Sequence, residues 1–262
     1  MKFAPNTATT AFVAAFMVSG VVQASAQDQD SVPAQPGIVF ELGLGGKVTP
    51  SYFGSSNLIL SPVPLFRMKR LTLPNGFTLG GGREEGFSLS PAIDVISKRS
   101  TKDSPELAGL RTIDTAVELG VAAKYQTGHF RIMGEVRRGF GGHDGFRGEL
   151  GADLIVRSGD QWTFHGGPRL NFADSTFTNT YFGVSAAEAS ARFPATTAGG
   201  GMMSAGLEAG VRYQMDEHWA IEAGAGWSRL TGDAAKSPIT AQGSKNQYNL
   251  SFGVLRRFDI GF

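Results

Sequence analysis

Bulky apolar residues alternate with small or polar residues along most of this chain, which is the pattern of an extended strand with one apolar face. The C-terminal segment has the clearest example. Its apolar row is Tyr248, Leu250, Phe252, Val254, Phe258, Ile260 and Phe262, and Arg256 is the one interruption. The positions between them are mostly polar or small. The chain therefore predicts a final strand with one face suited to an apolar environment.

The same period of two recurs upstream. It predicts ten strands, near residues 37–47, 57–67, 86–97, 111–125, 129–138, 145–157, 161–172, 201–215, 218–230 and 245–262. Segments of this length match tilted strands that cross a bilayer. We therefore predict an all-β fold, an antiparallel up-and-down transmembrane β-barrel over residues 37–262. The turn signal Pro74-Asn75-Gly76 could add a hairpin and raise the count to twelve strands.

The connectors between these segments alternate in length. Short ones at residues 126–129, 158–160 and 216–218 alternate with long ones at 97–110, 139–145, 173–200 and 231–244. Outer-membrane barrels have short periplasmic turns and longer outer loops, with aromatic girdles at both interfaces. The aromatic residues beside the short turns and the C-terminus fit the periplasmic girdle: Tyr125, Phe130, Trp162, Tyr213, Trp219 and Phe262. A soluble β-sandwich, the alternative, would not need aromatic residues at both strand ends.

The N-terminus predicts export. Lys2, a short apolar stretch over residues 11–22 and the small-residue site Ala24-Ser25-Ala26 form a signal peptide pattern. We predict a cleaved signal peptide at residues 1–26 and a periplasmic linker at residues 27–36. A membrane anchor is the alternative, but the apolar stretch falls short of the roughly 20 residues that a spanning helix needs.

Composition narrows the class further. The predicted signal peptide contains one of the 24 basic residues and none of the 23 acidic ones, so the mature chain has no formal net charge. This balance does not favour a nucleic-acid partner. The chain has no Cys, which excludes a disulfide framework and a thiolate metal site. No cofactor is indicated.

Two short turns predict the pairing of charged residues in the lumen. A three-residue turn at 158–160 would place Asp153 opposite His165 and Glu149 opposite Arg169. The same rule at 216–218 would place Arg212 opposite Glu222. Opposite charges that face each other across strands stabilise a sheet by about 0.2 to 1 kcal/mol per pair. We therefore interpret these residues as structural lumen pairs.

The sequence contains few residues in a pattern that would indicate a catalytic site or a metal site. The four His residues are His129, His143, His165 and His218, and the predicted His165–Asp153 pair supplies two members of a catalytic triad. The chain has no Gly-x-Ser-x-Gly phrase that would supply a nucleophile. His143 and Asp144 have no third ligand at a useful spacing. We predict a protein without enzymatic activity and without a metal site.

Three short sequence motifs in the predicted loops are not explained by strand periodicity and resemble those of a known family. They are residues 50–56 (PSYFGSS), residues 180–185 (TYFGVS) and residues 228–239 (SRLTGDAAKSPI). With the terminal Phe262, they resemble the MltA-interacting protein family, MipA/OmpV, over essentially the whole mature chain. Within these phrases, Gly54, Gly183 and Gly232 are expected at turn positions with positive φ.

The resemblance implies a barrel in the outer membrane of a Gram-negative bacterium, in contact with outer-membrane lipid and lipopolysaccharide. Some family members are proposed to scaffold a lytic transglycosylase and a murein synthase, and others are described as surface or adhesion proteins. Phe262 resembles the C-terminal assembly signal of such barrels. A narrow passive pore is the alternative function, because barrels of ten to twelve strands lie between those filled by side chains and open porins. The long loop at 173–200 could fold inward.

Overall fold

The computed structural model describes residues 35–80 and 86–262. The predicted signal peptide and most of the linker fall on residues 1–34 and lie outside the described residues. The described part is dominated by antiparallel strands: β1 (Gly37–Pro50), β2 (Leu58–Thr72), β3 (Thr78–Gly80), β4 (Gly86–Ile96), β5 (Ala116–Thr127), β6 (Phe130–Gly141), β7 (Phe146–Ser158), β8 (Trp162–Ala173), β9 (Gly201–Gln214), β10 (Trp219–Leu230) and β11 (Asn246–Gly261).

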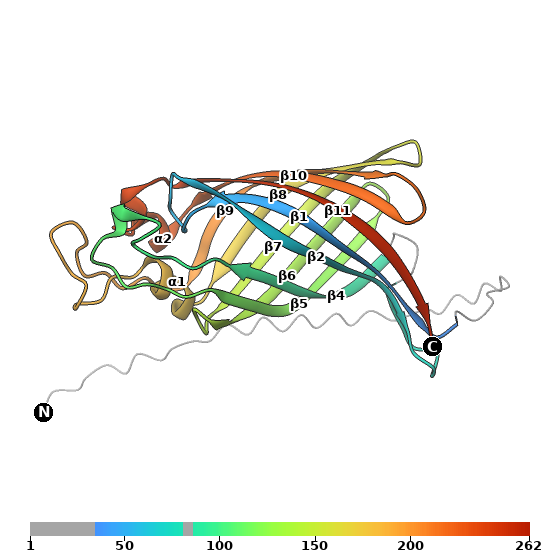
Figure 1. Cartoon of the computed structure of the whole chain (residues 1–262), viewed down its shortest axis with the longest axis horizontal. Coiled ribbons are helices and arrows are strands. Elements are labelled where there is room, and N and C mark those ends of the chain that lie inside the picture. The colour runs from blue at the N-terminus through green and yellow to red at the C-terminus, as the bar shows by residue number, and fades with distance from the viewer. Residues whose placement is uncertain (1–34, 81–85) are drawn as a thin grey trace, which may run out of the picture. The chain divides into compact units, whose positions relative to one another are not determined.

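The strands form one sheet that curls into a barrel. Their order is β3-β2-β1-β11-β10-β9-β8-β7-β6-β5-β4, and β1 pairs with β11, so the two ends of the barrel sequence meet (Figure 1). The short β3 runs in the same direction as β4 and is the element before it in the chain, so we count the two together as one barrel strand. The result is a barrel of ten antiparallel strands, and the predicted fold class is confirmed.

The turn signal at Pro74-Asn75-Gly76 joins β2 directly to β3. The backbone N–H of Leu73 donates to the carbonyl of Phe77 at 2.8 Å, and Gly76 has a φ of +82°. The turn closes a hairpin, because β3 pairs with β2 antiparallel. Since β3 runs in the direction of β4 and is counted with it, this hairpin adds no pair of strands to the ten in the part of the chain that the structure describes, and the count of twelve is wrong.

One predicted strand begins too early. Residues 111–115 lie in a loop, and β5 begins at Ala116. Ile113 instead forms an isolated bridge with Arg99 and is buried in a loop core. Its apolar side chain fits the alternating pattern, but it packs beneath other loops and not against lipid.

The alternation separates two environments. Outward positions are exposed although they are apolar, as at Leu154, Phe164 and Leu150, whereas Glu118, Asp153 and Arg169 on the inner face are buried. This is the reverse of a soluble sheet, in which the apolar face is covered. None of the described helices has both the length and the apolar character needed to cross a membrane.

The register at one short turn differs from the prediction by two residues. Ser158 pairs with Trp162 and Ile155 with His165, so the turn residues are 159–161 and Gly159 has a φ of +61°. A left-handed first turn residue suits glycine, which explains why the turn begins there and not at Ser158. Because side chains alternate with a period of two, a two-residue shift leaves every residue on its predicted face.

The turn between β9 and β10 has the register that the sequence predicts. Arg212 stands opposite Glu222, and Leu207 stands opposite Trp227. Among the three family-like glycines, Gly54 and Gly232 have positive φ, but Gly183 has a φ of −78°. The expectation for Gly183 was wrong, because close packing and not handedness requires glycine there: a Cβ would lie 2.3 Å from the Oδ1 of Asn179.

Candidate functional site

The end of the barrel that carries the long loops is closed by a hydrophobic plug. The helices α1 (Ser175–Phe182) and α2 (Gly232–Lys236) gather at this end, whereas the C-terminus lies at the other (Figure 1). The short 3-10 helices η1 (Pro105–Leu107) and η2 (Thr240–Gln242) also belong to these loops. The buried core of the plug comprises two clusters: Ile113, Ala173, Phe177, Tyr181, Phe182, Ala198, Met203, Leu230 and Ala234, and then Tyr52, Leu107, Leu110, Val184, Phe193 and Ile239.

Local sequence positions α1 within the plug. Asp174 caps the helix, because its side chain accepts a hydrogen bond from the backbone N–H of Phe177 at 2.8 Å. The hydroxyl of Thr178 donates to the carbonyl of Asp174 at 2.9 Å and lies close to the carbonyl of Gly199 at the far end of the loop. The loop at 173–200 is therefore a folded unit that packs on the barrel mouth.

The three family-like phrases meet in the plug. Tyr52, Phe182 and Ile239, one from each phrase, are all buried there. The hydroxyl of Ser237 donates to the carbonyl of Phe182 at 2.6 Å, which ties the third phrase to the second. The ring of Phe53 lies 5.1 Å from that of Tyr181, which ties the first to the second. These phrases thus hold the outer loops together.

Two buried polar groups support the plug, and the sequence pattern did not single out either. The guanidinium of Arg99 donates to the carbonyl of Tyr181 at 2.8 Å, and burial lowers the pKa of Arg99 to about 10. Burial also raises the pKa of Tyr52 to about 12, reinforced by nearby Glu106. Both groups are ordered parts of the loop core.

A first charge cluster lies in the lumen directly below the plug. Glu118 is fully buried, and one of its carboxylate oxygens lies 3.1 Å from the Nε of Arg137 and 3.2 Å from the Nη1 of Arg147. His143 approaches the other oxygen at 3.3 Å, and its ring stacks edge-on against Phe177 of the plug. The cluster therefore joins the plug to the inner wall of the barrel.

A second cluster contains the first predicted lumen pairs. Asp153 does not pair with His165, as predicted, because the two-residue register shift places His165 opposite Ile155. Asp153 instead binds Arg131 and the Nη2 of Arg169, the latter at 2.8 Å. Arg169 stands opposite Gly151, and its Nε lies 3.6 Å from Glu149, so these two residues are near each other without being directly opposed.

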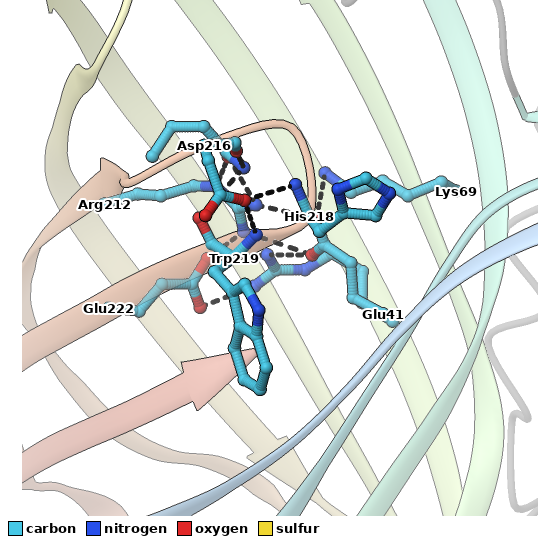
Figure 2. Close-up of polar contacts among 9 residues, drawn as sticks. Glu41, Lys69, Arg212, Asp216, His218, Trp219 and Glu222 are labelled. Carbon is cyan, nitrogen blue, oxygen red and sulfur yellow. Dashed lines mark hydrogen bonds and ion pairs between the residues drawn. The ribbon is translucent and has the colours of Figure 1, made fainter. Parts of the chain in front are cut away.

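A third cluster surrounds the remaining predicted pair. The Nη1 of Arg212 lies 2.8 Å from Glu222, and its Nη2 lies 2.6 Å from Glu41 on β1 (Figure 2). Arg67 bridges the same two carboxylates from β2, at 2.6 Å from Glu222 and 3.2 Å from Glu41. A pair predicted from one hairpin is therefore part of a four-residue network that joins β1, β2, β9 and β10.

Below the plug the lumen contains a cavity of about 1690 Å³. Its lining includes the third cluster and reaches the short-turn residues Asp160 and His218. Among residues 35–80 and 86–262, no group of three His, Cys, Asp or Glu side chains is arranged to hold a metal ion. The lining therefore combines charged side chains, such as Glu41 and Arg212, with apolar ones, such as Val63 and Leu65.

The C-terminal residue lies at the same end as the short turns. The backbone N–H of Phe262 donates to the carbonyl of Pro36 at 3.2 Å, and its side chain is exposed. Aromatic side chains also gather beside the short turns, where the rings of Trp162 on β8 and Tyr213 on β9 lie 4.6 Å apart. An exposed apolar outer face, an aromatic rim, short turns at one end and plugged loops at the other define this protein as a bacterial outer-membrane β-barrel.

The chain belongs to the MltA-interacting protein MipA family, whose model matches residues 42–258. It is accordingly an outer-membrane protein of a Gram-negative bacterium. Comparison with curated proteins gave no match. Among solved structures, it is similar to the COG4313 outer membrane channel from Pseudomonas putida F1, at 12% identity and a TM-score of 0.44, with 89% of this chain and 100% of that chain covered.

Two other solved structures are similar over comparable lengths. One is Neisserial surface protein A, at 12% identity and a TM-score of 0.31, with 84% of this chain and 97% of that chain covered. The other is Ail, the attachment invasion locus protein of Yersinia pestis, at 10% identity and a TM-score of 0.27, with 86% and 99% covered.

Proposed function

We propose that this protein is a non-enzymatic scaffold that holds a lytic transglycosylase, and through it a murein synthase, at the inner face of the outer membrane. The observation that carries the proposal is membership of the MltA-interacting family over residues 42–258. Such partners act on peptidoglycan and would meet the barrel at its short-turn rim. Exposed residues at that rim, including Asp160 and Glu217, are available to a partner.

The closed outer end argues against the passive pore as the main function. Phe177, Phe182 and Phe193 are fully buried in loops that pack across the mouth, above the buried Glu118. An open channel needs a hydrated path, and none of these three side chains lines the lumen cavity. Planar-bilayer recordings test this point: we expect no stable conductance, and reproducible single-channel steps would favour the pore.

The charged groups of the lumen support a structural and not a catalytic role. Asp153, which would have oriented His165, is neutralised by two guanidinium groups. A general base needs a partner within hydrogen-bond reach and a nucleophile beside it. The ion pairs that form instead match the need to satisfy buried charge in a barrel interior.

Capture of purified lytic transglycosylase by the barrel in lipid nanodiscs tests the scaffold. Charge reversal of the periplasmic rim with Asp160→Lys and Glu217→Lys should weaken capture, whereas Lys102→Glu in an outer loop should leave it unchanged. All three side chains are exposed, so folding should be preserved. Equal capture by every variant, or none by the wild type, would contradict the proposal.

A further inference from the structure

The barrel wall has a seam between β2 and β4. The sheet begins at β3 and ends at β4, so the two long strands on either side of the seam are β2 and β4. β3 pairs with Arg70–Thr72 of β2 and covers this edge near the short-turn rim. Farther from that rim, the residues that the structure describes form no backbone ladder between β2 and β4.

Prolines on both strands account for the seam. Pro62 and Pro64 lie on β2, and Pro91 lies on β4. Proline has no N–H to donate, and alternate residues direct their backbone groups to the same neighbouring strand. Because β1 pairs with β2 without interruption at Pro62 and Pro64, the missing donors belong to the edge that faces β4. The sequence therefore leaves this edge without three of the donors that a backbone ladder would need.

The lumen cavity extends into the seam. On the eight other long strands, the residues that line the cavity all lie on one face of their strand, as expected for side chains that face the lumen. On β2 and β4, by contrast, every residue from Pro62 to Arg70 and from Gly86 to Val95 lines the cavity. A cavity bordered by both faces of a strand must pass its edge, so the cavity continues through the wall.

The seam is apolar at the level of the lipid tails. Val63 and Leu65 of β2 border it on the lumen side, and Phe66, Leu89 and Ile93 border it on the outer side. These residues lie in the middle of their strands, where the surrounding medium is hydrocarbon. An acyl chain can therefore enter the seam without leaving an apolar environment.

Cations lie where such a chain would end in the cavity. Arg67, Lys69 and Arg70 lie at the inner end of β2. In this region the pairing of β2 with β1 shifts register, between Val39 and Phe40 of β1. Arg67, Lys69 and Arg212 all pair with Glu41, and Arg67 and Arg212 also pair with Glu222, so three cations share two carboxylates in the third cluster. The buried Nε of Arg70 has no hydrogen-bond partner among the described residues. The local excess of positive charge favours an anionic group.

We propose that the seam is a lateral portal that binds a single-chain anionic amphiphile, such as a long-chain fatty acid, taken from the membrane. The acyl chain occupies the slot between β2 and β4, and the carboxylate lies beside Lys69 and Arg70. The plug closes the cavity on the outer side, so the ligand exchanges with the bilayer and the periplasmic side. This site does not depend on the proposed scaffold function.

Cysteine protection tests the portal, because the natural chain has no Cys. Ala92→Cys places a thiol on the lumen face of β4 at the seam, and Thr163→Cys places one on the lining of β8, far from the seam in the strand order. Each variant is refolded in phosphatidylcholine vesicles, and its modification by a small water-soluble thiol reagent is timed with stearate, with acetate or with neither. Heat-dependent gel mobility serves as the folding check.

We expect stearate at ten times its dissociation constant to slow modification of the thiol at position 92 about tenfold, and to leave position 163 unchanged. Arg70→Ala in the Ala92→Cys background should raise the half-protecting stearate concentration about tenfold. Equal protection by acetate would indicate a site for soluble anions. The proposal would be overturned by any of three results: equal protection by acetate, equal protection of both thiols by stearate, or no protection of the thiol at position 92.

A second variant tests the role of the prolines. Pro62→Thr, Pro64→Thr and Pro91→Thr together restore the missing donors and allow β2 to pair with β4. We expect stearate protection at position 92 to be lost in the folded variant. If the triple variant does not fold, Pro91→Thr alone should reduce protection. Undiminished protection in the folded variant would refute entry through the seam.

Discussion

Arginine substitution at two depths of the outer face tests the orientation of the barrel in the membrane. Leu154 lies four residues before Ser158, where β7 ends at a short turn, and its side chain is 50% exposed. At about 3.4 Å per residue and a tilt of about 40°, Leu154 lies about 10 Å above that turn. This is near the middle of an apolar band about 25 Å tall.

The matched control is the same change at Leu58. This residue begins β2 beside an outer loop and is 51% exposed, so the two leucines differ in depth and not in burial. Leu154→Arg should destabilise the folded barrel by about 2 to 4 kcal/mol, and Leu58→Arg by about 0 to 1 kcal/mol. The larger cost corresponds to a change of about thirtyfold to several hundredfold in the folding equilibrium constant.

Urea titrations of unfolding and refolding in lipid vesicles measure both costs, with the fluorescence of the three native tryptophans as the signal. Glu149→Gln provides an inner-face control and should cost less than Leu154→Arg, because Arg169 keeps Asp153 as a partner. An equal or larger cost at Leu58, or a Leu154→Arg cost below about 1 kcal/mol, would refute the assignment of the lipid face and its depth.

Four further predictions concern the lumen, the plug and assembly. Glu222→Gln should cost about 3 kcal/mol by the same titration, and Arg212→Gln added to it should recover part of that loss, because fewer buried cations then lack a carboxylate. Asp174→Ala removes the cap of α1 and should lower loop stability by about 1 kcal/mol in limited proteolysis, whereas Ser175→Ala should have little effect. Burial alone would raise the pKa of Glu188, but hydrogen bonds from Ser185 and Arg111 lower this pKa to about 2. The ionised carboxylate therefore stabilises the outer loops fully above pH 4.5, and this stabilisation is lost as the pH falls through 2. Glu188→Gln should flatten that pH dependence of the melting temperature. Deleting Phe262 should reduce the heat-modifiable protein recovered in outer-membrane fractions, and an unchanged yield would contradict its role as an assembly signal.

The sequence by itself determined the class of fold. A period of two with an apolar row is a local property, because successive side chains of a strand point to opposite faces whatever the partner strand is. It therefore defined the strands, their lipid and lumen faces and the membrane environment. The turn at 216–218 also gave the Arg212–Glu222 register, since a short turn constrains the pairing of the residues that flank it.

The details that depend on turn geometry and distant contacts were decided by the tertiary structure. Gly159 takes a left-handed conformation, and the β7–β8 register differs by two residues from the predicted one. As a result, Asp153 forms ion pairs with Arg131 and Arg169 and does not pair with His165. Arg67 and Glu41 join Arg212 and Glu222 only because barrel closure brings β1 and β2 beside β10 and β11. Residues that are far apart along the chain cannot be recognised as neighbours from the sequence pattern alone.

The plug and the seam show the same division. The long loop at 173–200 was visible in the sequence, but the packing of Phe182 with Ser237 and Ile113 depends on loops that are far apart along the chain. Pro62, Pro64 and Pro91 are equally visible, yet a proline reveals an open edge only when the neighbouring strand is known. Local periodicity is encoded residue by residue, whereas the identity of a neighbour is set by closure of the whole barrel.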